Sequence, residues 1–376
     1  MSTKIQISRE DILQLFNKYY RNLLQGAKIV DIQELSGGYV EKIYKIVIQQ
    51  TNDVQTKTKE EFAYVFKTYM FGDGFPYDKE RKLYLINKSI GASLIFKKYV
   101  TSKAIVPLLS DNKKYLEDLG DMFIAVFPYV PHKKIVREKM PLKVHKDVVT
   151  FLAHMHNKYV KNKPQVDKMA QKLRIEVPTI AMYDKLNKQL QKRVELGPEI
   201  LPKLQQINSN VANIYVEGNK YAKKFLQEYR KILSFVPTRY LSHRDFTANN
   251  ILFNKNWSIV GLVDFDRAKY MNFYRELWFY VFYSIIAPRQ LDFEKSAEIV
   301  RRMIQVYLRT VNFDVDKTKF LQGALIELVY WFTKSWSFEE YVKAPSKFED
   351  LMQRTIYMHK HFWDMREVVE EVVGEV

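Results

Sequence analysis

The segment HRDFTANN, residues 243–250, holds the side chains of this chain that are best suited to chemistry, and VDFD follows at residues 263–266. Phosphoryl transfer from a nucleoside triphosphate needs a carboxylate near the acceptor hydroxyl and oxygen ligands that hold magnesium against the phosphates. Asp245 would accept or orient the acceptor proton, while Asn250 and Asp264 would be the metal ligands. Turn-capping by chance would explain each residue singly, but not the ordered set.

The pattern H-x-D-x-x-x-x-N, with Asp264 fourteen residues after Asn250, resembles the catalytic and metal-binding motifs of kinases. This variant resembles the aminoglycoside phosphotransferase and choline kinase superfamily, with some similarity to its spore-coat-type members. Asp264 lies in D-F-D and not D-F-G, and no A-P-E follows. The resemblance implies a bilobal, protein-kinase-like α+β fold that moves the γ-phosphate of ATP, with Mg²⁺, to a hydroxyl of a small molecule.

A candidate phosphate-binding turn precedes these motifs. Ser36, Gly37 and Gly38 lie between two segments of alternating apolar and polar residues, where backbone without bulky side chains could approach phosphate. A glycine pair between strands is far more often an ordinary turn. Its position ahead of the other motifs is what makes it a candidate.

Lys67 lies on a predicted strand between Val65 and Tyr69, so its ammonium would have apolar neighbours. A buried ammonium is costly unless it is paired, and the α- and β-phosphates of ATP and a carboxylate of the next helix would pair it. Glu80 is the first choice for that carboxylate, and Asp78 is the second. An edge-strand lysine beside a solvated helix face is the alternative.

The adenine site implied by the resemblance is the connection between the lobes, which begins at Phe127. Backbone groups of Pro128, Tyr129 and Val130 would contact the base, and Phe127 would enclose it together with Val65. Proline has a carbonyl acceptor but no N–H donor, so the donated bond would come from Val130.

The elements that must position these residues separate into two groups. Strand patterns dominate the first 130 residues, after a short helix that Ser8 and Asp11 would cap. Helical periodicity dominates the rest apart from two short strands at 251–253 and 259–265, and single helices are expected over 204–233 and 348–372. We therefore expect an N-terminal nucleotide-binding lobe, 1–130, and a C-terminal catalytic and substrate-binding lobe, 131–376. The second lobe would contain a helical insertion at about 160–235.

Composition excludes several classes of site. The chain has 376 residues and no cysteine, so disulfides, thiolate metal sites and thiol nucleophiles are excluded. The N-terminus lacks a secretory pattern, and the most apolar run, 277–287, is too short to span a membrane. We expect a cytoplasmic protein.

The net charge is +17, and most of the excess lies between residues 131 and 240. Solvated lysine-rich helices explain this better than a nucleic-acid-binding surface, which stays a possible alternative. The positive charge also argues against a polycationic aminoglycoside as acceptor, while a sugar or an amino alcohol such as choline would fit. Aromatic residues at 330–341 near Glu327 could cage choline, although helical aromatics are more often core. A catalytically idle, spore-coat-like scaffold is the other alternative.

Overall fold

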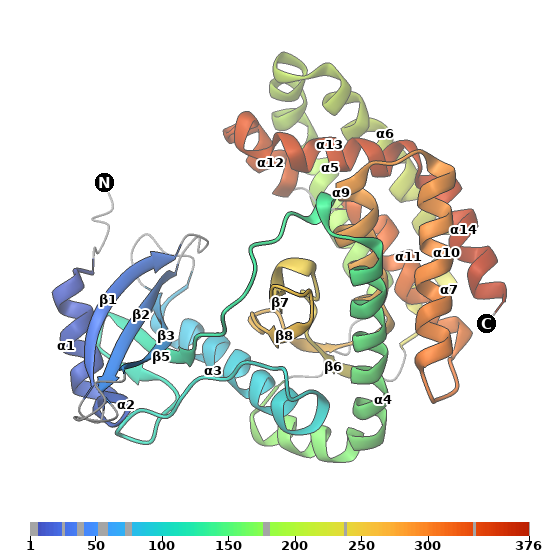
Figure 1. Ribbon diagram of the computed structural model, residues 1–376. Helices are drawn as coiled ribbons and strands as arrows, with labels where there is room; N and C mark the ends of the chain where they lie inside the picture. The colour runs from blue at the N-terminus through green and yellow to red at the C-terminus, as the bar shows by residue number, and fades with distance from the viewer. Residues whose placement is uncertain are drawn as a thin grey trace. The chain divides into compact units, whose positions relative to one another are not determined.

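The computed structural model describes residues 7–24, 27–35, 41–51, 59–71, 77–175, 181–236, 239–333 and 336–375. They form one larger antiparallel sheet, two short two-stranded sheets and many helices, which confirms the predicted α+β class (Figure 1). By their contacts the residues separate into two compact units, and each is described by itself. Unit 1 contains 1–133, 172–174 and 251–266, and unit 2 contains 134–171, 175–250 and 267–376. The predicted lobe limits, 1–130 and 131–376, stay a prediction.

The sheet of unit 1 has five antiparallel strands in the order β1-β2-β3-β5-β4. Their register pairs Ile43 of β2 with Lys67 of β3, and Val65 of β3 with Phe127 of β5. Because paired residues of antiparallel strands point to the same face, Val65, Lys67 and Phe127 share one face of the sheet. The strands are β1 (Lys28–Leu35), β2 (Lys42–Thr51), β3 (Lys59–Met70), β4 (Glu117–Asp118) and β5 (Met122–Pro128).

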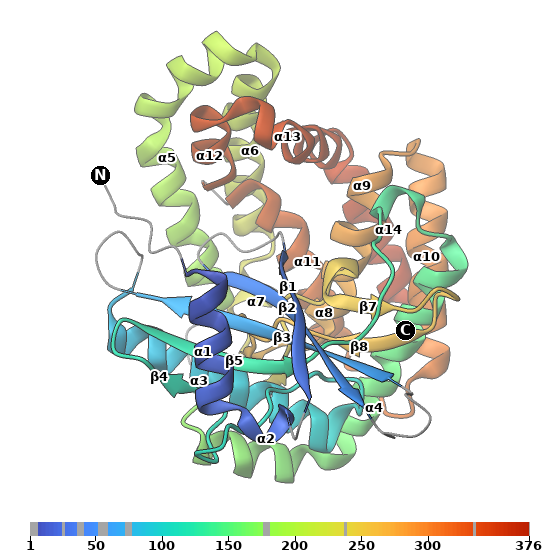
Figure 2. The same cartoon turned by 60° about the vertical axis from the view of Figure 1, so that its left-hand side comes forward.

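Helices cover both faces of this sheet. On one face α1 (Arg9–Tyr19) and α2 (Arg21–Leu24) pack Phe16 against Phe66, and Figure 2 shows α1 crossing the strands. On the other face α3 (Lys79–Ile95), which continues as η1 (Phe96–Val100), packs Ile86 against Phe123. Lys67 lies on the α3 face, since Tyr69, two residues later, belongs to that core.

The hairpin of β7 (Ile251–Phe253) and β8 (Ile259–Leu262) also belongs to unit 1. Leu262 forms a bridge with Ala104, and its carbonyl accepts a 2.9 Å hydrogen bond from the N–H of Ile105. The second strand was predicted to reach residue 265 but ends at 262. The chain therefore leaves regular structure just before Asp264.

Unit 2 is helical, apart from the pair formed by β6 (Tyr240–Ser242) and β9 (Lys269–Met271). One helix was predicted over 204–233, but the chain breaks at Asn208, whose side chain caps the next helix by accepting from the N–H groups of Asn210 and Val211. The short 3-10 turns are η2 (Arg137–Lys139) and η3 (Ala248–Asn250). The helices are α4 (Leu142–Lys172), α5 (Met182–Ile207), α6 (Ser209–Glu228), α7 (Arg230–Ser234), α8 (Tyr274–Tyr280), η4 (Val281–Ile286), α9 (Ala287–Arg289), α10 (Phe293–Thr310), α11 (Lys317–Thr333), α12 (Trp336–Lys343), α13 (Pro345–Lys360) and α14 (Phe362–Gly374).

Helix α11 lies at the centre of unit 2 and packs against α5, α6, α8 and α14. It is buried on nearly all sides, which is why its sequence is apolar around the whole helix. In the part of the chain that the structure describes, no helix has the length and apolar character needed to cross a membrane.

Candidate active site

The loop that follows β6 in unit 2 carries Asp245 and Asn250. The main-chain carbonyl of Asp245 accepts two hydrogen bonds of 2.8 Å, from the N–H of Thr247 and from Nδ2 of Asn250. These bonds close the loop into one turn and orient the Asn250 amide, whose oxygen is left as an acceptor. The Asp245 side chain is 22% exposed, so its carboxylate can meet a ligand.

Buried partners fix the backbone of this loop. Arg244 has a φ of 67°, a left-handed conformation that is uncommon for a residue with a side chain. Its N–H donates to Oε1 of Glu276 at 3.1 Å. His243 is fully buried, and its Nδ1 accepts the N–H of Asp245 at 3.3 Å. These contacts make His243 a scaffold for the loop, as its buried position requires.

Asp245 and Asn250 line a cavity of about 300 Å³ within unit 2. Its walls carry four arginines: Arg137, Arg244, Arg267 and Arg275. Nε of Arg267 lies 3.9 Å from the Asp245 carboxylate. Arg275 is bound by Glu327 in an ion pair whose two side chains are 5% and 2% exposed. The cavity therefore offers a carboxylate to a hydroxyl, and its walls carry four guanidinium groups beside the carboxylates of Asp245, Glu276 and Glu327.

The aromatic residues at 330–341 divide between this cavity and the core. Tyr330, Trp331 and Trp336 line the cavity. Phe338 is fully buried in the core that α5, α6, α12 and α13 form. Glu327 neutralises Arg275, so it is not free to balance a quaternary ammonium. The arrangement resembles a cation cage less than the sequence alone would suggest.

Lys67, in unit 1, is held by two carboxylates. Its Nζ lies 3.4 Å from Asp266 and 3.6 Å from Glu41, and its side chain is 15% exposed. The same ammonium lies 4.8 Å from the ring centre of Tyr69. Lys82 of α3 binds the other oxygen of Glu41 at 3.0 Å. Two cations and two carboxylates thus form one partly buried network.

The charges of this network change the pKa values of its members. Burial alone would lower the pKa of Lys67, but the neighbouring Tyr69, Asp266, Glu41 and Asp264 outweigh it and raise the pKa. Burial raises the pKa of Tyr69, so this phenol stays neutral. The carboxylates therefore account for the raised pKa of Lys67. Burial would raise the pKa of Asp266, but Lys67 lowers it. Lys67 and Asp266 are therefore both ionised at neutral pH.

The partner expected for Lys67 differs in the structure. Glu80 is exposed, and the ion pairs of Lys67 are with Glu41 and Asp266 instead. Lys82 is the residue of this first helical turn that points to the sheet, and Glu80, two positions earlier, lies on another side of the helix. Asp78, the second choice, caps α3 by accepting the N–H of Arg81 at 2.7 Å.

Asp264 lies two residues after β8, with a φ of 64°. It is exposed, and its charge is close enough to raise the pKa of Lys67. The structure thus brings Asp264 and Lys67 into the same neighbourhood of unit 1. Asp266, which also accepts a 2.7 Å hydrogen bond from the Ser89 hydroxyl, belongs to the same neighbourhood.

The segment predicted to bind adenine ends β5 in unit 1. Phe127 faces Val65 across the sheet, and the strand ends at Pro128. The N–H of Tyr129 donates to the carbonyl of Ala63 at 3.0 Å. The Val130 carbonyl lies 2.8 Å from Nδ1 of His132. The predicted phosphate-binding turn, Ser36, Gly37 and Gly38, lies outside the described residues.

A sequence profile of the phosphotransferase enzyme family (APH) matches residues 100–321. This is more than half of the chain. The chain belongs to this family. The match confirms the family predicted from the Asp245, Asn250 and Asp264 motifs, and with it a kinase-type phosphotransferase.

Several solved structures share the fold. Spectinomycin phosphotransferase, in complex with ADP and spectinomycin, is 15% identical, and the alignment covers 100% of both chains with a TM-score of 0.59. An aminoglycoside 2'-phosphotransferase in complex with GDP has a TM-score of 0.57 at 15% identity, with 91% of this chain and 97% of that chain covered. Ethanolamine kinase of Plasmodium vivax gives 0.54 at 10% identity, with 95% and 90% covered. These similarities confirm the kinase-like bilobal fold.

One curated relative is a viral protein, the "Probable serine/threonine-protein kinase" of fowlpox virus, strain NVSL. It is 29% identical over 119 residues, which is 31% of this chain and 38% of the viral protein. The chain thus matches well under half of the length of that relative.

Proposed function

We propose that this protein transfers the γ-phosphate of ATP to a hydroxyl of a small molecule, with Mg²⁺ as the metal. The observation that carries the proposal is the position of Asp245, a partly exposed carboxylate in the wall of a cavity of about 300 Å³. In this proposal residues 1–130 bind the nucleotide, and residues 131–376 carry out catalysis and bind the acceptor. Solved relatives were obtained with ADP or GDP, which supports a nucleotide donor.

Asp245 would act on the acceptor. Its carboxylate accepts the proton of the acceptor hydroxyl as the hydroxyl oxygen forms a bond to the γ-phosphorus. The bond between the γ-phosphorus and the bridging oxygen breaks, and its electron pair leaves with ADP. Arg267, whose Nε lies 3.9 Å from the Asp245 carboxylate, would help to orient that carboxylate toward the hydroxyl.

Lys67 would hold the nucleotide through its α- and β-phosphates. Glu41 and Asp266 position its ammonium before the phosphates bind, so binding costs less side-chain entropy. The backbone of Pro128, Tyr129 and Val130 would meet the base, and the predicted turn at 36–38 would meet the phosphates. Glu80, being exposed, would contribute little to this site.

Asn250 and Asp264 would be the magnesium ligands. An amide oxygen and a carboxylate are the hard oxygen donors that Mg²⁺ prefers, and kinase sites use one or two carboxylates together with substrate phosphates. Among the residues that the structure describes, no group of three or more His, Asp or Glu could hold a metal alone. This donor set fits a metal that binds with the nucleotide. When bound, Mg²⁺ neutralises the developing charge on the phosphates.

The acceptor would be a small molecule and not a protein. Asp245 lies in a cavity of limited volume, and a protein hydroxyl would need an open surface. Choline is disfavoured because Glu327 is already paired with Arg275. Sugars and amino alcohols remain within the proposed acceptor class.

The test is transfer of radiolabelled phosphate from ATP, with magnesium, to a panel of sugars, amino alcohols and hydroxy acids, with a serine-containing protein as a further acceptor. We expect transfer to at least one small alcohol. Asp245→Ala should lose at least about a hundredfold in rate, the loss expected for removing a general base that also orients the acceptor. Asp264→Asn, which weakens a magnesium ligand, should lose the magnesium-dependent transfer.

Three results would contradict the proposal in different ways. Undiminished transfer by Asp245→Ala would refute the catalytic assignment. Phosphate appearing on the protein acceptor alone would refute the small-molecule class. A protein that neither binds nor hydrolyses ATP would instead be the idle scaffold.

A further inference from the structure

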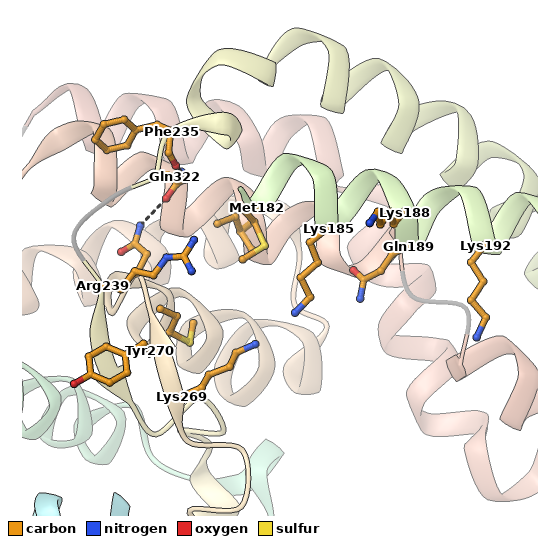
Figure 3. A pocket seen from close by; sticks show the side chains of 13 residues that line it. Met182, Lys185, Lys188, Gln189, Lys192, Phe235, Arg239, Lys269, Tyr270 and Gln322 are labelled. Carbon is orange, nitrogen blue, oxygen red and sulfur yellow. Dashed lines mark hydrogen bonds between the residues drawn. The ribbon is translucent and has the colours of Figure 1, made fainter. Parts of the chain in front are cut away.

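A second cavity in unit 2, of about 490 Å³, lies between α5, β9 and α11 (Figure 3). Its walls carry five basic side chains, which are Lys185, Lys188, Lys192, Arg239 and Lys269. No acidic residue is among the described residues that line it. A cavity lined in this way is unusual, because cations gathered without anions repel one another.

The basic residues come from opposite walls. Helical spacing places Lys185, Gln189 and Lys192 along one side of α5, next to the face that packs into the core. Lys269 lies across the cavity on β9. Figure 3 shows the side chains of Lys185 and Lys269 extending into the same space.

Carboxylates near these lysines are used elsewhere. Glu327 forms a buried ion pair with Arg275. Asp167 pairs with Lys163 and accepts the hydroxyl of Tyr270 at 2.8 Å. Burial and neighbouring cations are the largest influences on the pKa of Lys269, and burial and Arg244 are the largest on that of Lys185. An anion in the cavity would therefore interact favourably with both lysines.

The electrostatic consequence is largest at Lys269. Burial lowers its pKa to about 5, with further lowering by the cations Arg244, Lys185 and Arg275. The pKa of Lys185 is also lowered, first by burial and then by Arg244. At pH 7 Lys269 is thus largely neutral, and an anion in the cavity would favour its protonation.

The remaining walls suit an organic molecule. Met182, Met271 and Ile326 supply apolar surface. Gln322 is fixed by donating to the carbonyl of Phe235 at 2.7 Å, as Figure 3 shows. Oε1 of Gln189 is buried without a hydrogen-bond partner among the described residues. An amide in this position can bond to a hydroxyl or, turned over, to an oxyanion.

We propose that this cavity binds a small organic molecule through a multivalent oxyanion, such as a phosphate group, held between Lys185 and Lys269. The lysines would bind the oxyanion, and the apolar wall would bind the organic part. The site does not depend on the proposed phosphotransfer. A nucleic acid would expose its phosphates along an open track, whereas here the amines gather in a cavity the size of one small ligand.

The test uses inorganic pyrophosphate as the probe, with the full-length protein, without magnesium, and isothermal titration calorimetry as the readout. We expect saturable binding that weakens about tenfold or more in Lys185→Gln combined with Lys269→Gln, the loss expected for hydrogen bonds to a charged group. Lys220→Gln, which removes one exposed charge on α6, should change the affinity less than about twofold. Lys67→Met should keep this binding.

Proton uptake gives a second readout. Because the bound oxyanion favours protonated Lys269, binding at pH 7 should take up protons, so the measured heat should depend on the ionisation enthalpy of the buffer. Affinity should rise as the pH falls towards 5. The charged groups that face Lys269 are Lys185 of α5, Arg244 of the loop after β6 and Arg275 of α8.

Lys185→Gln removes a charge that its cationic neighbours repel, and Lys269→Gln replaces a buried amine that is largely neutral at pH 7. The thermal unfolding of both single variants should therefore show no loss of stability, and each single variant should already weaken binding. Unchanged pyrophosphate affinity in the two single variants and the double variant would overturn the proposal. So would an equal loss in Lys220→Gln, or binding that disappears only in Lys67→Met. Tighter binding of a single-stranded oligonucleotide through the same lysines would replace the small-molecule site with a nucleic-acid surface.

Discussion

Lys67 shows how a buried ammonium is positioned before any ligand arrives. Its two carboxylate partners come from the residue just before β2 and from the segment after β8, and Asp266 is 199 residues away in the chain. A partly buried network of this kind is stable because each charge has a partner of opposite sign. Phosphates could bind Lys67 without a large rearrangement of its side chain.

Glu41 and Glu80 provide a matched comparison. Glu41→Gln removes one carboxylate from both Lys67 and Lys82, so we expect kcat/KM for ATP to fall about tenfold, as when an interaction with a charged group is lost. Glu80→Gln makes the same chemical change at an exposed position and should alter kcat/KM less than about twofold. Steady-state kinetics at fixed acceptor would measure both. Equal losses in the two variants would restore Glu80 as the partner.

The sequence predicted that the Lys67 ammonium would be paired, but it did not predict which carboxylates pair with it. Those partners depend on tertiary contacts between segments that are distant in the chain. Glu41 could have been proposed from the hairpin register, since Ile43 pairs with Lys67 and residue 41 points to the same face. No local pattern could indicate that Asp266 reaches Lys67. The motifs of Asp245 and Asn250, by contrast, are local, because one short loop fixes their relative positions through the bond between the Asn250 amide and the Asp245 carbonyl.

At the level of elements, local capping signals were more informative than periodicity. Ser8 and Asp11 form the reciprocal capping box that the sequence predicts for α1. Periodicity alone merged α6 with its neighbours, because an apolar pattern continues across the break at Asn208. The same occurred at His361, where one predicted helix over 348–372 is two. A change of helix direction leaves little trace in the spacing of apolar residues.

The cap of α3 can be tested apart from catalysis. Asp78→Ala removes the acceptor of the Arg81 N–H and should lower the free energy of unfolding by about 1 kcal/mol. Asp78→Ser should keep most of that stability, since a serine hydroxyl can cap the helix. Denaturant unfolding would provide the values, with phosphotransfer measured in parallel. Asp78 would regain a direct role at Lys67 if Asp78→Ser lost activity while keeping its stability.

At the scale of the whole molecule, the net charge of +17 has an uneven structural meaning. Many lysines of the basic segment are exposed on α4, α5 and α6, as solvated helices predict. The lysines of the second cavity in unit 2 are different, because they gather there with other residues drawn from 182 to 326. Composition could predict an excess of positive charge but not its convergence, which depends on how α5, β9 and α11 pack.

Ligand-induced stabilisation should separate the two proposed binding sites. A ligand at a hundred times its Kd stabilises the folded state by about 2.7 kcal/mol, which raises the Tm measurably. We expect Mg·ATP to raise the Tm of the wild type and of Lys185→Gln, but not that of Lys67→Met. Each shift is measured by thermal denaturation against the ligand-free Tm of the same variant. A full shift in Lys67→Met would place the nucleotide elsewhere.

The left-handed backbone at Asp264 affects how this residue should be replaced in experiments. Its φ of 64° lies where alanine is disfavoured by roughly 1–2 kcal/mol, whereas asparagine and aspartate adopt it more readily. An alanine variant would therefore mix a missing carboxylate with a displaced main chain, and lost activity would have two explanations. Asparagine neutralises the charge and keeps the backbone preference, so it isolates the electrostatic contribution.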